Sequence, residues 1–92
     1  HTERMTIARL RIAKGGVVPT HRHENEQVSM IDAGSLVFRI GEEEVLVRAG
    51  EAVRIPSNVP HSVVAPEDCV ATDLFTPPRQ DWISGDDSYL RK

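Results

Sequence analysis

The sequence has only one cysteine, Cys69, among its 92 residues. A single thiol excludes a framework of intramolecular disulfides, and we expect it to be a small buried hydrophobic residue in a protein of the reducing cytosol. No apolar stretch approaches membrane-spanning length, and no signal peptide is visible. The chain opens on His1 rather than on methionine, which leaves room for a leader or an additional first strand ahead of it.

Runs of basic residues are also absent. The 11 Lys and Arg residues are outnumbered by 14 Asp and Glu residues, which gives a formal net charge of -3. Nucleic acids and anionic membrane surfaces are therefore poor candidates for partners. With 39% hydrophobic and 27% charged residues, the composition is typical of one soluble, globular domain with a single core.

Helix signals are scarce, whereas alternation of apolar and polar residues, the period of a strand, is frequent. Gly, Pro or Asn residues separate the alternating stretches at regular intervals. Short strands at such spacing predict an all-β barrel or sandwich. We expect strands at residues 5–13, 27–33, 36–40, 45–48, 52–55, 61–65 and 69–75, and we place the only candidate helical turn in residues 81–92.

The stretch HRHENEQ, residues 21–27, contains two histidines two positions apart. In an extended strand His21 and His23 share one face, and Gln27 shares it if the extended conformation continues. His61 opens a separate predicted strand and adds a third imidazole if that strand lies opposite. Three imidazoles and an amide oxygen suit one divalent transition metal ion, such as Ni, Zn, Mn, Fe or Cu, and leave coordination positions open. The alternative is a polar loop with solvated histidines.

Two segments resemble the motifs of the cupin family. Residues 15–34 read G, five residues, H-x-H, three residues, Q, six residues, G, which is similar to the first motif with Gln27 where most cupins carry Glu. Residues 50–61, GEAVRIPSNVPH, are similar to the second, with Asn58 in place of the usual Gly; Asn tolerates a positive φ. The resemblance implies a single jelly-roll β-barrel domain over residues 1–92, with a C-terminal tail from about residue 76. It also implies a metal near one mouth, bound by His21, His23, Gln27 and His61.

The stretch from Asp73 to Trp82 resembles the tail of the small cupins typified by the pectin-degradation protein KdgF. Members of that family open the ring of 4,5-unsaturated uronates to linear keto acids. Their function depends on an Asp, a Phe two residues later and an Arg four beyond that, which in this chain are Asp73, Phe75 and Arg79. The resemblance therefore implies a metal-dependent, ring-opening isomerase for small sugar acids.

Physical arguments give these three residues roles and alternatives. Asp73 either faces solvent or looks into the barrel, where a carboxylate is costly unless it is paired or transfers protons. Arg79, which follows two prolines, suits bidentate capture of a carboxylate, and its alternative is a surface salt bridge with Asp81. Phe75 lines the sugar face or belongs to the core. Trp82 is expected to pack the tail against the barrel or a second subunit.

Two other functions stay open from the sequence. One is another metal-dependent cupin enzyme, a dioxygenase or a lyase. The other is a non-enzymatic cupin that binds small ligands. For each of these functions the expected partner is a small molecule. Small size and family habit favour a homodimer, and the single cysteine favours the cytoplasm.

Overall fold

The computed structural model describes residues 1–83. These residues form strands β1 (Thr6–Ile12), β2 (Val17–His21), β3 (Glu26–Ala33), β4 (Ser35–Ile40), β5 (Glu43–Arg48), β6 (Ala52–Ile55), β7 (His61–Val64) and β8 (Cys69–Thr76), followed by the single turn of α1 (Gln80–Ile83). Within residues 1–83, no helix is long and apolar enough to cross a membrane.

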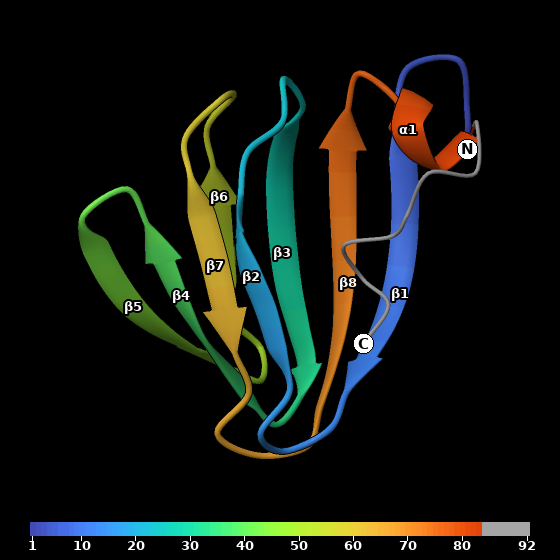
Figure 1. Ribbon diagram of the computed structural model, residues 1–92. Coiled ribbons are helices and arrows are strands. Elements are labelled where there is room, and N and C mark those ends of the chain that lie inside the picture. Colours follow the sequence, from blue (N-terminus) through green and yellow to red (C-terminus); the bar gives the residue numbers. More distant parts are fainter. Residues whose placement is uncertain (84–92) are drawn as a thin grey trace.

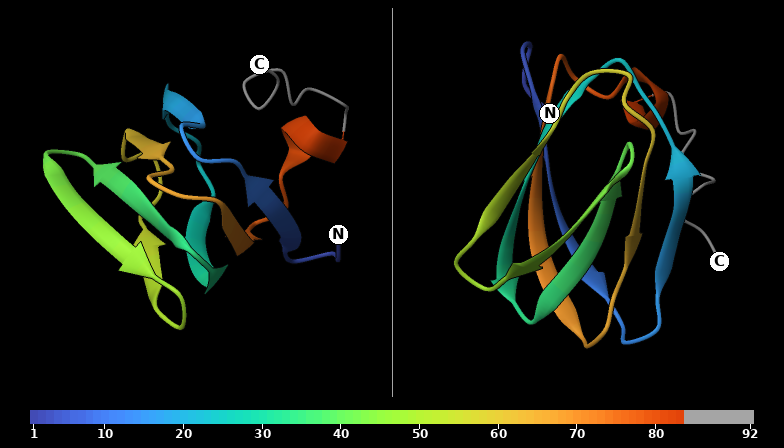
Figure 2. Two further views of the ribbon diagram at one scale, coloured as in Figure 1. Left: turned by 90° about the horizontal axis from the view of Figure 1, so that it is seen from below. Right: turned by 90° about the vertical axis from the view of Figure 1, so that its left-hand side faces the viewer.

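The strands form two four-stranded antiparallel sheets. One has the order β1-β8-β3-β6 and the other the order β2-β7-β4-β5, and the sheets face each other around a common core (Figures 1 and 2). The chain changes sheet at every connection except the hairpin between β4 and β5. This arrangement confirms the all-β, jelly-roll prediction. It also gathers the end of β2, the start of β3, the start of β7 and the end of β8 at one mouth, beside α1 (Figure 1).

The core lies between the sheets because alternate residues of each strand point inward. In β8 the residues Cys69, Ala71, Asp73 and Phe75 are buried, whereas those between them are half-buried. Cys69 is the small buried residue that the sequence predicted, and burial raises the pKa of its thiol. The core cluster consists of Ile31, Leu36, Phe38, Val47, Ile55, Val63, Ala65, Cys69 and Ala71.

Two motif positions require special backbone geometry. Gly34, the last residue of the first motif, has φ 75°, and a Cβ there would lie 2.0 Å from the backbone oxygen of Asp68. Any side chain at this position would therefore clash with the turn before β8. Asn58, at the usual glycine position of the second motif, has φ 60°. The prediction that Asn meets the conformational requirement of this turn is confirmed.

One condition of the sequence prediction is not met. Gln27 was expected to share a face with His21 and His23 if the extended conformation continued, but β2 ends at His21 and β3 begins at Glu26 in the other sheet. The intervening residues form the loop that crosses between the sheets. The helical turn of α1 begins at Gln80, at the edge of the segment expected to hold one; residues 84–92 of that segment lie outside the described residues.

Candidate metal centre

Three histidines converge at the mouth of the barrel. His21 ends β2 and is the register partner of His61, which begins β7, so both come from one sheet. His23 comes from the loop that crosses to the other sheet, and the ligand atoms of the three rings lie within 4.8 Å of one another. Their convergence agrees with the prediction, but its cause is different. The crossing loop, rather than the parity of one strand, brings His23 to the other two.

Each imidazole is held by a backbone carbonyl. Nδ1 of His21 lies 2.9 Å from the oxygen of Pro19, Nδ1 of His23 lies 2.9 Å from that of Asn25, and Nδ1 of His61 lies 2.8 Å from that of Val59. A carbonyl oxygen only accepts, so each Nδ1 carries the proton and donates it. In a neutral ring the lone pair is then on Nε2, which is the tautomer required of a metal ligand.

The environment keeps two of the rings neutral. Burial is the main cause that lowers the pKa of His61 to about 4, and the neighbouring histidines and Arg79 lower it further. Burial and the charge of Arg79 also lower the pKa of His23. Nε2 of His61 is buried and has no hydrogen-bond partner among residues 1–83. A buried, deprotonated nitrogen of this kind is satisfied by a cation.

Gln27 directs its oxygen at the histidines. Its amide nitrogen donates to Oγ of Ser29 at 2.8 Å and, at 3.4 Å, to Oδ2 of Asp73, while its Oε1 lies 3.2 Å from Nε2 of His23. The amide is buried, and its two donor bonds fix which way it points. Three nitrogen lone pairs and one carbonyl oxygen thus face one region, and this donor set fits a divalent transition metal ion.

Asp73 lies beside this centre. It points into the barrel from β8, directly opposite Ser29 of β3, and its side chain is buried. Burial raises the pKa of Asp73 to about 6, against the opposing effects of a hydrogen bond from Ser29 and the charge of Arg79. The carboxyl group therefore exchanges a proton readily near neutral pH, as a general acid or base must.

Arg79 is also inside the molecule, with 2% of the residue exposed. Its Nε and one terminal nitrogen donate to the two carboxylate oxygens of Asp81, at 2.9 and 2.5 Å. Its Cζ lies 4.8 Å from the ring centroid of Phe75 and 4.3 Å from that of Trp82. The ion pair with Asp81 that we considered is present, but it is not a surface pair on the arginine side. Partial burial acts to raise the pKa of Asp81, but the hydrogen bond from Arg79 and its charge outweigh this effect and lower the pKa.

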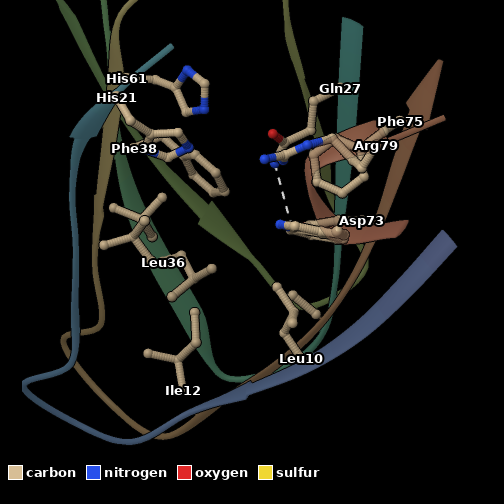
Figure 3. Close-up of a pocket in the computed structure, with 14 residues that line it drawn as sticks. Leu10, Ile12, His21, Gln27, Leu36, Phe38, His61, Asp73, Phe75 and Arg79 are labelled. Atoms are coloured by element: carbon tan, nitrogen blue, oxygen red, sulfur yellow. Dashed lines mark hydrogen bonds between the residues drawn. The ribbon is translucent and has the colours of Figure 1, made fainter. Parts of the chain in front are cut away.

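One pocket connects these groups. Figure 3 shows His21 and His61 on one side and Gln27, Asp73, Phe75 and Arg79 on the other, above an apolar floor. The cavity has a volume of about 40 Å³, roughly room for three water molecules. A cavity of this volume has room for only part of a sugar-sized molecule. The floor consists of Leu10, Ile12, Val18, Leu36, Phe38, Val63 and Ala71.

Three polar residues of this region were not among the site residues predicted from the sequence. Ser29 is two residues from Gln27 on the same face of β3, so strand parity would have found it. Thr6 is buried at the start of β1, and its Oγ1 accepts the backbone N–H of Arg79 at 2.9 Å. Asn25 is buried in the crossing loop and donates to backbone oxygens of Pro77 and Pro78. No local signal distinguishes Thr6 or Asn25, because their partners are more than 50 residues away.

The fold and the site together define a small jelly-roll β-barrel with a three-histidine cluster at its mouth. Residues 8–75 match the family model described as "Cupin domain". The chain belongs to the cupin family. No curated protein sequence matches it significantly.

Several solved structures have the same fold as this chain. KdgF from Halomonas sp. superposes with a TM-score of 0.84 at 28% identity, over 89% of this chain and 76% of that one. An RmlC-like cupin from Shewanella frigidimarina NCIMB 400 has the same TM-score at 24% identity, over 89% and 74% of the two chains, and shows the fold alone. The protein TT1209 from Thermus thermophilus is 28% identical with a TM-score of 0.79, over 86% and 78%. The predicted resemblance to small cupins such as KdgF is confirmed.

Proposed function

We propose that this cupin is a metal-dependent enzyme that opens the ring of 4,5-unsaturated uronates to linear keto acids. The observation that carries the proposal is the content of one pocket. It is lined by His21, His61 and Gln27, by a carboxyl group whose pKa is about 6 and by a buried arginine, and His23 completes the three-histidine cluster beside it. The likeness to KdgF, at 28% identity, supports the family resemblance from which this reaction is inferred.

His21, His23, Gln27 and His61 would hold the metal ion through Nε2 and Oε1 atoms. A bound divalent ion would supply Lewis acidity at a substrate oxygen. Because Gln27 replaces the carboxylate of most cupins, the donor set carries no negative charge, which strengthens that Lewis acidity. The buried Nε2 of His61 is the observation that fits this role.

Asp73 is proposed as the group that moves the proton. Ring opening removes one proton from the anomeric hydroxyl and breaks the bond between the anomeric carbon and the ring oxygen. The electron pair of that bond stays on the former ring oxygen, and the resulting enolate becomes a ketone when one proton is added to its neighbouring carbon. The product is an isomer of the substrate, so no redox step is needed. A carboxyl group with a pKa of about 6 can perform both transfers near neutral pH.

Arg79 is proposed to bind the substrate carboxylate. A guanidinium has five N–H donors, and the ion pair with Asp81 uses two of them. A substrate carboxylate would share the guanidinium with Asp81 or replace Asp81 on it. Phe75 contacts the ring of His23 edge-on, with 5.6 Å between centroids, as well as the guanidinium. It is therefore placed to line the sugar face between the metal ligands and Arg79.

The direct test uses unsaturated monouronate released by a lyase. The loss of its ultraviolet absorbance is followed with metal-loaded protein, metal-free protein and no protein, so that the spontaneous rate can be subtracted. We expect a rate above the spontaneous one only in the metal-loaded sample. A loaded protein that matches the spontaneous rate would reject the proposal. Binding of the sugar acid without turnover would then favour a ligand-binding cupin, and substrate-dependent oxygen uptake would favour a dioxygenase.

The homodimer expected from the sequence belongs to the same proposal, as does a cytoplasmic location. A row of aliphatic residues on the outer face of the β2-β7-β4-β5 sheet supports the dimer: Val17 pairs with Val64, Val64 with Val37, and Val37 with Leu46. Three of the four are exposed, and such a row favours association. Light scattering should give the mass of a dimer for the wild type and of a monomer for Val64→Glu. A monomeric wild type would contradict it.

A further inference from the structure

Asn25 contacts both halves of the proposed site. Its backbone oxygen accepts the Nδ1 proton of His23 at 2.9 Å. Its side-chain nitrogen donates to the backbone oxygen of Pro77 and, at 3.2 Å, to that of Pro78. The residue is only 4% exposed. One side chain therefore connects the loop that carries a metal ligand to a segment more than 50 residues away.

The segment that receives these bonds directly precedes Arg79. Pro77 and Pro78 have no N–H, so their carbonyl oxygens are the only backbone groups through which they can be hydrogen-bonded. On the far side of the segment, the backbone N–H of Arg79 donates to Thr6. The guanidinium itself is oriented by its hydrogen bonds to Asp81 and by the rings of Phe75 and Trp82. Among residues 1–83, Asn25 is the side chain that ties this segment to the metal loop.

We infer that Asn25 is a positioning residue, which sets the separation between the metal centre and the Arg79 guanidinium. This inference rests on the proposed function, in which the substrate joins those two groups across the pocket (Figure 3). A substrate held at both ends has one productive separation, and a displacement of about 1 Å costs on the order of 10²-fold in rate. An amide is the suitable side chain, because its NH₂ group satisfies two carbonyl oxygens, that of Pro78 in a buried position, without adding charge.

Two substitutions separate this role from the metal site. Asn25→Asp is isosteric but turns a carboxylate oxygen toward the two carbonyl oxygens, and Asn25→Ala removes the donor. Neither changes the backbone oxygen that holds His23. The matched control is Ser57→Ala, which removes a different tether of the same loop, the 2.6 Å hydrogen bond from Ser57 Oγ to the oxygen of Glu24. That bond leads to the turn between β6 and β7 rather than to the Arg79 segment.

The position of the Arg79 segment can be read without any substrate. Trp82 is the only tryptophan of the chain, and its ring lies 4.3 Å from Cζ of Arg79. A bound Co²⁺ or Cu²⁺ ion quenches its fluorescence to an extent that depends on distance, and Zn²⁺ serves as the reference that does not quench. We expect both Asn25 variants to bind metal with an affinity within roughly two-fold of the wild type. With Co²⁺ or Cu²⁺ bound they should retain more Trp82 fluorescence than the wild type. The control variant, Ser57→Ala, should match the wild type in both measurements.

Kinetics supply the second measurement. With unsaturated uronate, kcat/KM of the Asn25 variants should fall by about 10-fold or more, mainly through KM. In an Arg79→Ala background the same substitutions should change kcat/KM by less than roughly two-fold, because the residue acts through Arg79. Unchanged quenching, an equal effect of Ser57→Ala, independent effects in the double variant, or loss of metal would each overturn the inference. If the wild type does not turn over the uronate, the proposed function fails, and the quenching comparison still decides the role of Asn25.

Discussion

Nε2 of His23 and Oε1 of Gln27 lie 3.2 Å apart, although neither atom carries a proton when the ring is neutral. The proton of His23 is on Nδ1, where Asn25 accepts it, and the amide of Gln27 is turned by its bonds to Ser29 and Asp73. Two acceptors this close repel each other unless a cation lies near both. This pair therefore favours a bound cation at the mouth of the barrel over a cluster of solvated histidines.

The first prediction concerns that pair. Gln27→Glu supplies an anionic oxygen, so metal content should be retained or increased while Lewis acidity falls. It also replaces an amide donor by an oxygen facing Asp73, and like charges raise the pKa of Asp73 further. Turnover at neutral pH should fall more than metal content, and the lower limb of the pH–rate profile should move to higher pH. Wild-type turnover and an unmoved profile would show that the neutral ligand is incidental.

The second prediction tests Asp73 as the proton carrier. Asp73→Asn keeps the shape of the side chain but cannot exchange a proton near neutral pH. Turnover should fall by roughly 10²–10⁴-fold, while metal content and the circular dichroism spectrum stay those of the wild type. Asp32→Asn, which changes an exposed carboxylate on β3, is the control and should be fully active. Unchanged turnover in Asp73→Asn would remove this residue from the mechanism.

The sequence was informative where chemistry depends on residues close together in the chain. Motif spacing identified the three histidines and Gln27, and alternation identified most strands. It failed at the loop between β2 and β3, because parity holds only within a continuous strand and the chain crosses to the other sheet there. The sequence also did not indicate that Arg79 would be buried. Its burial depends on Thr6 and on the rings of Phe75 and Trp82, contacts that only the folded chain creates.

The third prediction concerns the stability of the metal-free protein as a function of pH. His61 has a pKa of about 4 when folded, below the ordinary 6.5, so it contributes stability that is lost as the pH falls from about 6.5 through 4. His23, whose pKa is also lowered, acts in the same direction. Asp73 acts in the opposite direction: its folded pKa of about 6 exceeds the ordinary 3.8, so its contribution is present below 3.8 and is lost as the pH rises through 6.

Because His61 and Asp73 contribute to stability with opposite pH dependence, the free energy of unfolding of the wild type falls less on acidification than it would with the histidines alone. Asp73→Asn removes the compensating term. Between about pH 6 and pH 4 its free energy of unfolding should fall more steeply than that of the wild type, by up to about 3 kcal/mol. Urea denaturation in the presence of a chelator measures this difference, and Glu44→Gln, at an exposed site on β5, should follow the wild-type curve. Parallel curves for Asp73→Asn would contradict the shifted pKa of Asp73.

The fourth prediction tests the class of substrate through Arg79. Arg79→Lys keeps the charge but loses the planar fork, so it should impair turnover of the uronate despite its conservative nature. Arg79→Ala should cost more, about 2–4 kcal/mol in transition-state stabilisation, as measured by kcat/KM. A neutral sugar analogue without the carboxylate should bind poorly to the wild type and be indifferent to both changes. If both variants handle the uronate as the wild type does, the acidic-sugar assignment loses its main support.

The last prediction concerns Asp81, which holds two of the donors that a substrate carboxylate would use. Asp81→Asn keeps the shape of the side chain but removes the charge that pairs with the buried guanidinium, so the melting temperature should fall. An added carboxylate such as galacturonate then restores a negative charge beside Arg79. It should raise the melting temperature of Asp81→Asn more than that of the wild type, and KM for the unsaturated uronate should decrease. Xylose, which is neutral, and sodium chloride at matched ionic strength are the controls for sugar contacts and screening. Equal stabilisation of both proteins by galacturonate would contradict competition between the ligand carboxylate and Asp81 for Arg79, because only the variant has lost the carboxylate of Asp81.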